Sequence, residues 1–286
     1  LSISSMLTDR SGNLWFGSYN QFLYRLIRKD GKAVLRKYGK EKGMTDYRVL
    51  SLLMTRMGKL WLGSKHQGLF GYDAEKDRFM PEFLPGLKEI PRIYTMAEAS
   101  DGTLWIGIYR KGLLAWYPDG TTRLLTETDG LSDNRVIYLY PEPASDSLEI
   151  LWVGTSKGIS RLTLKDGQIS RIDRSQEDRI VIDFKKDEFG RIWFGTKTKG
   201  LNCLEPVPYR QWDRMQGLGN VILDLHKDHG GRVWISVYEK EIFYFEDHAA
   251  SPFIPKNQDL ASLLKGEAVM AIGRGNGNRL YFGTGI

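Results

Sequence analysis

The stretch Asp187-Glu-Phe-Gly-Arg-Ile-Trp-Phe-Gly-Thr196 decides the fold, because the chain repeats it along its length. Close copies are Asp9-Arg-Ser-Gly-Asn-Leu-Trp-Phe-Gly17 and Asp101-Gly-Thr-Leu-Trp-Ile-Gly107, and weaker copies complete a set of seven. Their central aromatic residues are Trp15, Trp61, Trp105, Trp152, Trp193, Trp234 and Tyr281. Successive aromatic residues lie 41 to 47 positions apart, a period typical of propeller blades and too long for short-repeat solenoids.

The flanks of each copy predict four short strands. In the second copy they are expected at 49–54, 59–63, 68–72 and 78–83, with a turn rich in Gly, Asp, Asn or Ser between the first two. The aromatic residue stands in an apolar run and precedes a Gly or, once, a Ser. This pattern indicates a strand buried on both faces and closely approached by the next sheet. We therefore predict an all-β, seven-bladed propeller that occupies residues 1–286 as a single domain, with the six tryptophans of the repeat largely buried.

Two copies depart from the common length. The fourth carries the insertion Pro141–Glu149, which is expected to lengthen its first hairpin. The seventh has only two predicted strands, at 268–273 and 279–284, so the last blade is expected to be incomplete in this chain. We expect its remaining strands to lie beyond Ile286 or before Leu1 in a longer protein, and stability to rise when they are restored.

Composition excludes several classes of protein. The chain has 41 basic and 35 acidic residues, and its formal charge of +6 does not by itself imply binding to nucleic acid or to a membrane surface. Cys203 is the single cysteine, so no internal disulfide can form, and its predicted strand places it in the core. The sequence contains no apolar run long enough for a transmembrane helix and no signal peptide. It has the character of a segment from a longer protein.

Chemistry that would require a metal, a cofactor or a nucleophile is not predicted. The four histidines are His66, His226, His229 and His248, and a spacing of three on a strand puts His226 and His229 on opposite faces. A zinc site needs three or four converging ligands, and none of the common nucleophile or phosphate-binding motifs occurs. Carboxylate pairs on loops leave a propeller enzyme, a lyase or a glycosidase, open as an alternative. A protein-interaction propeller is a second alternative.

The repeat resembles a known family. The stretch quoted first, followed by Gly200-Leu201, and the upstream segment Gly130-Leu-Ser-Asp-Asn-Arg-Val136 are similar to the two-component regulator propeller repeat, found in sensor segments of bacterial hybrid and ordinary histidine kinases. The resemblance implies a ligand-sensing, non-enzymatic propeller in the periplasmic or extracellular part of an inner-membrane receptor. It implies carbohydrate ligands, a parent chain that is a histidine kinase or carries another output domain, and membrane contact only through that parent. A second propeller in tandem, or self-association through the parent receptor, would be its protein partners, and nucleic acid would not bind this segment.

Basic residues gather in the loops that a propeller places on one face. Four arginines stand directly before the first strands of repeats two to five, and these are Arg48, Arg92, Arg135 and Arg179. Loops between second and third strands add Lys65, His66, Arg110, Lys157 and Lys197, with Tyr19, Tyr109 and Tyr238 as candidates for stacking on sugars. Guanidinium groups bind carboxylate or sulfate bidentately, so we predict a small anionic ligand, such as an acidic oligosaccharide, at the mouth of the channel. Surface ion pairs with Asp46, Asp133 and Asp178 are the alternative explanation.

Overall fold

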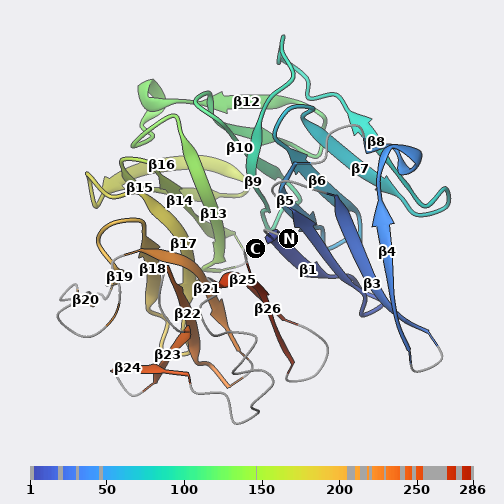
Figure 1. Cartoon of the computed structure of the whole chain (residues 1–286). Coiled ribbons are helices and arrows are strands. Elements are labelled where there is room, and N and C mark those ends of the chain that lie inside the picture. Colours follow the sequence, from blue (N-terminus) through green and yellow to red (C-terminus); the bar gives the residue numbers. More distant parts are fainter. Residues whose placement is uncertain are drawn as a thin grey trace.

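The first strand of every repeat runs along a central channel, and the other strands of that repeat follow outward from it (Figure 1). The computed structural model describes residues 3–18, 22–29, 32–44, 48–145, 147–204, 210–212, 218, 221–228, 230–238, 242–246, 249–253, 269–274 and 279–284. Within these residues the chain forms six antiparallel four-stranded sheets and one two-stranded sheet. The protein is therefore an all-β propeller.

In each four-stranded blade the strands pair in chain order, with the innermost strand first. The innermost strands are β1 (Ile3–Thr8), β5 (Val49–Met54), β9 (Ile93–Glu98), β13 (Val136–Pro143), β17 (Val181–Lys186) and β21 (Ile222–Lys227). The second strands are β2 (Leu14–Ser18), β6 (Leu60–Ser64), β10 (Leu104–Ile108), β14 (Leu148–Thr155), β18 (Ile192–Thr196) and β22 (Val233–Val237). The predicted strands of the second repeat differ from β5 to β8 by at most one residue at either end.

The outer half of each blade is formed by its third and fourth strands. The third strands are β3 (Leu23–Lys29), β7 (Leu69–Asp73), β11 (Gly112–Trp116), β15 (Gly158–Lys165), β19 (Leu201–Leu204) and β23 (Ile242–Glu246). The fourth strands are β4 (Lys32–Tyr38), β8 (Arg78–Glu82), β12 (Thr122–Leu125), β16 (Gln168–Ser175), β20 (Arg210–Trp212) and β24 (Ala249–Pro252). Two short 3-10 helices, η1 (Lys40–Lys42) and η2 (Glu127–Asp129), follow β4 and β12. The predicted lengthening of the fourth blade is confirmed, since β13 and β14 have eight residues each.

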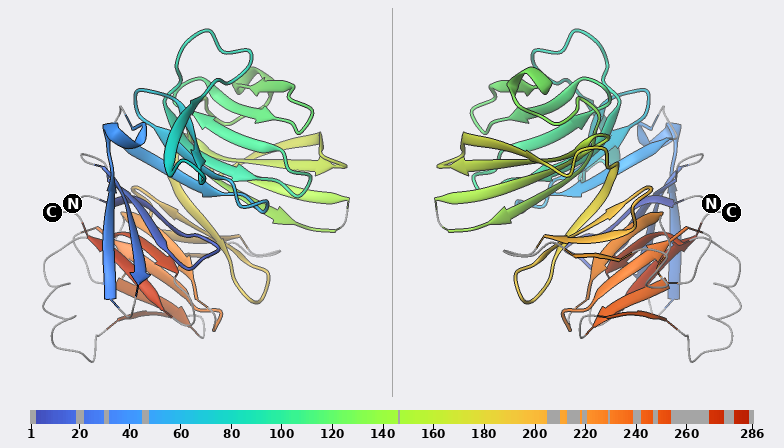
Figure 2. Two further views of the ribbon diagram at one scale, coloured as in Figure 1. Left: turned by 90° about the vertical axis from the view of Figure 1, so that its right-hand side faces the viewer. Right: turned by 90° about the vertical axis from the view of Figure 1, so that its left-hand side faces the viewer.

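The prediction of a seven-bladed ring is wrong. Six repeats form four-stranded blades, whereas in the described part of the chain the last repeat contributes only the two-stranded sheet of β25 (Val269–Arg274) and β26 (Leu280–Thr284). This sheet lies between the sixth blade and the first, because β25 contacts both β21 and β1. Its red strands stand beside the blue strands of the first blade in Figures 1 and 2. The sequence motif marks the first hairpin of a blade, and a hairpin alone is not a blade.

A branched residue at the start of each first strand packs on a glycine of the preceding sheet. A Cβ added to Gly17 would lie 2.4 Å from Val49, and one added to Gly195 would lie 2.5 Å from Ile222. The other pairs are Gly63 with Ile93, Gly107 with Val136, Gly154 with Val181, and Gly283 with Ile3. The predicted role of these glycines in close approach is confirmed. The last pair carries the same packing from β26 to β1, so the two-stranded sheet closes the ring.

The repeated tryptophans are buried as predicted, with relative exposures from 0% to 8%, and Cys203 is buried in the core as well. Most of their indole N–H groups donate to a carboxylate in the same hairpin. The pairs are Trp15 with Asp9 (2.9 Å), Trp152 with Glu142 (2.7 Å), Trp193 with Asp187 (2.7 Å) and Trp234 with Asp228 (2.9 Å). In the first, fifth and sixth blades the acidic residue therefore supports the buried indole in addition to forming the turn.

The third blade lacks this interaction. Ala99 stands six residues before Trp105, where the first, fifth and sixth blades have Asp, and the Trp105 indole nitrogen is buried without a hydrogen-bond partner among the described residues. Asp101 begins this copy of the repeat in the sequence, but its carboxylate accepts from Thr103 instead, at 2.9 Å and 2.7 Å.

Candidate functional site: the cationic mouth and the central channel

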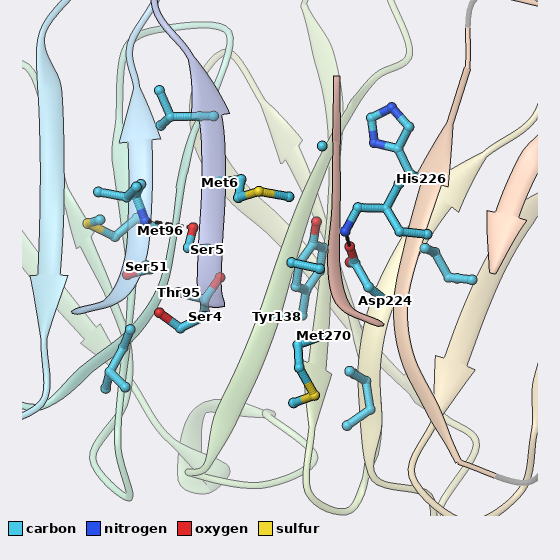
Figure 3. A pocket seen from close by; sticks show the side chains of 18 of the residues that line it. Ser4, Ser5, Met6, Ser51, Thr95, Met96, Tyr138, Asp224, His226 and Met270 are labelled. Atoms are coloured by element: carbon cyan, nitrogen blue, oxygen red, sulfur yellow. Dashed lines mark hydrogen bonds between the residues drawn. The ribbon is translucent and has the colours of Figure 1, made fainter. Parts of the chain in front are cut away.

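A central cavity of about 820 Å3 is lined by the first strands of all six blades and by β25. In each of these seven strands one residue bulges out of the ladder near the start of the strand. These residues, here called the channel ring, are Ser4, Leu50, Tyr94, Ile137, Ile182, Leu223 and Met270, and all of them line the cavity. Bulges re-aim a side chain relative to the regular strand. Figure 3 shows Ser4 and Met270, which belong to the neighbouring strands β1 and β25.

The residue before each first strand forms the inner edge of the channel mouth, where it continues the ladder to the second strand. The carbonyl oxygens of Arg48, Arg92 and Arg135 accept from the backbone of the loop that follows β6, β10 and β14, at 3.0, 2.9 and 3.2 Å. In the fifth and sixth blades the equivalent positions are Ile180 and Val221, each at 2.9 Å from its donor. Three of the four predicted arginines thus share one structural position, and Arg179 precedes it by one residue.

Three guanidinium groups surround one tyrosine at this mouth. The Cζ atoms of Arg92, Arg110 and Arg135 lie 4.6, 5.1 and 5.5 Å from the centre of the Tyr109 ring. Tyr109 is also stacked on Tyr94, with ring centres 5.3 Å apart and an angle of 18° between the planes. Cations are attracted to the ring quadrupole at such distances. Tyr109 therefore gathers the three arginines, here called the arginine cluster, over the third and fourth blades.

Ion pairs do not neutralise the arginine cluster. Among the described residues, none of its three guanidinium groups forms an ion pair with a carboxylate, and Nε of Arg135 is buried without a hydrogen-bond partner. The sequence offers Asp133 as a partner for the Arg135 guanidinium. In the structure, the Asp133 carboxylate accepts from the backbone N–H of Arg135 at 2.7 Å and forms its ion pair with Lys157 at 3.4 Å. The surface ion-pair explanation therefore does not account for these three arginines.

The other predicted site residues are distributed around the mouth. Arg48 donates to Nε2 of His66 at 3.3 Å, next to half-buried Lys65 on the second blade. Arg179 donates to Asn202 at 2.6 Å, which turns its guanidinium toward β19 of its own blade. Lys197 and Tyr238 are exposed on the fifth and sixth blades, away from the arginine cluster. Tyr19 lies outside the described residues.

Lys185 lines the channel and forms an ion pair with Asp183 that the sequence analysis did not predict. The Lys185 ammonium donates to Tyr138 Oη at 3.0 Å and to Asp183 Oδ1 at 3.3 Å. Asp183 is 1% exposed and also accepts the backbone N–H of Leu225 at 2.9 Å, in the next blade. Asp224 makes the equivalent bond to the last repeat, where it accepts the N–H of Ile272 at 2.5 Å. These carboxyl groups join the first strands of the fifth, sixth and last repeats.

Asp224 is expected to make the stability of the fold depend on pH. Burial raises the pKa of Asp224 well above its usual value, and the neighbouring Asp183 carboxylate raises it further. The folded state therefore keeps a proton that the unfolded chain releases above a pKa of 3.8. This contribution to stability is full below that pKa and is lost as the pH rises through the higher folded pKa. Asp224→Asn keeps an acceptor for the Ile272 N–H but cannot ionise.

Urea unfolding of both proteins between about pH 4 and pH 9 measures this effect. As the pH rises toward the folded pKa of Asp224, we expect the unsubstituted protein to lose stability relative to Asp224→Asn. The difference in the free energy of unfolding should change by up to about 1.4 kcal/mol per pH unit. Asp224→Ala removes the acceptor as well and should be less stable than Asp224→Asn at every pH. Parallel pH profiles for Asp224→Asn and the unsubstituted protein would contradict the proton assignment.

Within the residues that the structure describes, no group of three or more His, Cys, Asp or Glu side chains could hold a metal ion. His226 faces the channel, and His229 and His248 lie outside the described residues. Nor does the described part contain a helix that could cross a membrane.

Comparison with known proteins confirms the resemblance noted in the repeat. Residues 1–20 match the model of the two component regulator propeller family. A search of curated protein sequences finds no significant match to the chain.

Solved structures share the fold. The extracellular domain of one putative hybrid two component system from B. thetaiotaomicron aligns with 99% of this chain at a TM-score of 0.77 and 18% identity. A second such domain from the same organism aligns with 99% of the chain at 0.76 and 20% identity. PorZ, a surface component of the type-IX secretion system of Porphyromonas gingivalis, aligns with 99% at 0.68 and 11% identity.

The present chain spans only 38%, 37% and 45% of those solved chains. At these identities the likeness shows the fold. The protein is a β-propeller domain related in fold to the extracellular domains of hybrid two component systems.

Proposed function

We propose that this chain is the ligand-sensing propeller of a two-component receptor, lying outside the cytoplasmic membrane, and that it binds a small anionic ligand at the arginine cluster. The observation that carries the proposal is the set of three guanidinium groups without carboxylate partners around Tyr109, whose ring stacks on Tyr94 in the wall of the central cavity. Guanidinium groups held in fixed positions recognise carboxylate and sulfate by geometry as well as charge. Acidic carbohydrates are one class of ligand that presents such groups.

The bonding of the carboxyl groups at the channel favours a sensor over an enzyme. Asp183 and Asp224, the carboxyl groups that line or adjoin the channel, each accept a backbone N–H from the next repeat, which is a structural use of both. A histidine kinase as the parent chain, a second propeller in tandem and self-association through the parent remain predictions from the resemblance.

Replacing Arg92 and Arg135 together by Ala is expected to weaken binding of sulfate and glucuronate at least tenfold, because each hydrogen bond to a charged group contributes about 1.5–3 kcal/mol. Isothermal titration calorimetry measures the affinities. Binding to the unsubstituted protein should also weaken with added sodium chloride, because salt screens exposed charges.

A double variant of Arg78 and Arg123 is the matched control, since it removes the same charge from the exposed outer strands β8 and β12. It should leave both affinities unchanged. Full affinity in the Arg92 and Arg135 variant would remove the proposed site.

A further inference from the structure

We propose that the ligand is a carboxylate with an apolar body, which enters the central channel end-on while its carboxylate stays at the arginine cluster. This inference rests on the proposed function of the mouth and names the class of ligand that it takes.

The arginine cluster adjoins the channel ring at Tyr94. Arg92 and Tyr94 are two residues apart on one extended segment, as are Arg135 and Ile137. Each of these arginines therefore stands within two residues of a ring residue that lines the cavity. Tyr94 belongs to both layers, because it lines the cavity and stacks on Tyr109. A carboxylate at the cluster therefore has the channel immediately beneath it.

The channel ring presents apolar surface to this space. Ile137, Ile182, Leu223 and Met270 remain partly exposed although they lie at the centre of the molecule and line the cavity. By contrast, the aliphatic side chains that pack on glycines between blades, such as Val49 and Ile93, are buried. Apolar surface left open to a cavity is stabilised when an apolar group covers it.

Several polar side chains of the cavity already have protein partners, and Ser51 Oγ, which has none among the described residues, is buried away from the open space. Ser4 Oγ donates to the carbonyl of Val49 at 2.6 Å, and Ser5 Oγ accepts the N–H of Leu52 at 3.2 Å. Elsewhere in the wall, Tyr138 Oη accepts from Lys185, and Asp224 accepts from the N–H of Ile272, as described above; Figure 3 shows Tyr138 and Asp224. The hydroxyl groups of a sugar would lose water on entering and would find few open partners, which is costly. An apolar body loses nothing in this way.

The size of the cavity fits such a body. Its volume of about 820 Å3 lies within the range of about 300–1,000 Å3 for small-molecule sites. The geometry thus assigns two recognition elements to one ligand: the guanidinium groups take the carboxylate, and the aliphatic ring takes a cyclic or linear hydrocarbon attached to it.

Two ligands that differ only in polarity test the proposal. Cyclohexanecarboxylate and glucuronate each carry one carboxylate on a six-membered ring, and only glucuronate has hydroxyl groups on it. We expect cyclohexanecarboxylate to bind at least tenfold more tightly than glucuronate in calorimetric titrations of the same protein. Cyclohexylmethanol, which keeps the ring and lacks the charge, should bind at least tenfold more weakly than cyclohexanecarboxylate.

Two variants of the ring separate the channel from the mouth. Ile182→Trp fills part of the cavity, and Met270→Gln replaces apolar surface by polar surface at similar volume. Both residues lie away from the arginine cluster, on β17 and β25. Each variant should reduce the affinity for cyclohexanecarboxylate at least fivefold and leave the affinity for sulfate unchanged. Circular dichroism of each variant shows whether the fold is retained, and the two substitutions are independent tests.

The outcomes distinguish the two proposals. Equal affinity for the two ring carboxylates, unaffected by Ile182→Trp and Met270→Gln, would overturn the channel proposal and leave an anion site at the mouth. Tighter binding of glucuronate would overturn it in favour of a sugar ligand. Failure of sulfate and of both carboxylates to bind would overturn the proposed function itself.

Discussion

Replacing Asp183 by Ala is expected to lower the free energy of unfolding by about 3–5 kcal/mol, the cost of removing one partner from a buried ion pair. The Lys185 ammonium, 20% exposed and 3.3 Å from Asp183, would lose its anionic partner. The backbone N–H groups of Phe184 and Leu225 would lose their acceptor as well. Urea unfolding followed by tryptophan fluorescence measures the change, because the repeated indoles are buried in the folded state.

Two comparisons identify the cause of that loss. Adding Lys185→Met to Asp183→Ala removes the unpaired charge and should recover part of the stability, which a double-mutant cycle quantifies. Asp173→Ala breaks the exposed pairs with Arg161 and Arg171 and should cost only about 0–1 kcal/mol. If Asp183→Ala costs no more than Asp173→Ala, the channel pair does not stabilise the ring.

The second large effect is expected at a glycine between blades. Gly195→Ala places a methyl group 2.5 Å from Cγ2 of Ile222 and 2.9 Å from its Cβ, and a branched side chain cannot move aside as a flexible one can. Overpacking of this kind costs about 3 kcal/mol at the upper end of its usual range. Thermal unfolding should therefore show a clearly lower midpoint for Gly195→Ala.

The contact itself can be tested by removing its other side. Ile222→Ala leaves a cavity and is destabilising alone, but Gly195→Ala added to it should cost little more, because the new methyl group then has room. Gly230→Ala is the control: its Cβ would meet nothing closer than 3.4 Å, and the change should be small. Additive costs for Gly195→Ala and Ile222→Ala would show that the two residues do not meet.

Much of the fold can be predicted from the sequence because the repeat records local structure and packing together. An aromatic residue, an aliphatic neighbour and a glycine at fixed spacing specify a doubly buried strand, and the observed strands of the second blade match the predicted ones within one residue. The predicted number of blades was wrong because the repeat motif covers only the first hairpin of a blade and does not determine how many strands follow it. The unsupported Trp105 indole was missed because Asp101 resembles the turn residue of other copies while occupying another position in the hairpin.

The candidate site could be predicted only in outline. A run of arginines before successive strands is visible in the sequence, but their convergence on Tyr109 depends on how three loops meet, which no local pattern records. Tyr109 was predicted to stack on a sugar, and the structure places it among guanidinium groups with Tyr94 on its ring. No sequence pattern marks the bulge that defines the channel ring, because the bulged residues differ in chemical type. Ser4 is small and polar, whereas Met270 is large and apolar. The ion pair between Asp183 and Lys185 was not predicted either, because no sequence pattern marks it.

The one-residue offset of Arg179 indicates how such a protein can change what it recognises. Ile180 occupies the mouth position of the fifth blade, and Arg179, one residue earlier, bonds to Asn202 within its own blade. The packing of Val181 on Gly154 is unaffected by that offset. A single insertion or deletion in the loop before a first strand would therefore exchange the side chain presented at the mouth and leave the inter-blade contact in place. Ligand specificity in this architecture can therefore change through the length of one loop, in one blade at a time, while the packing between blades is kept.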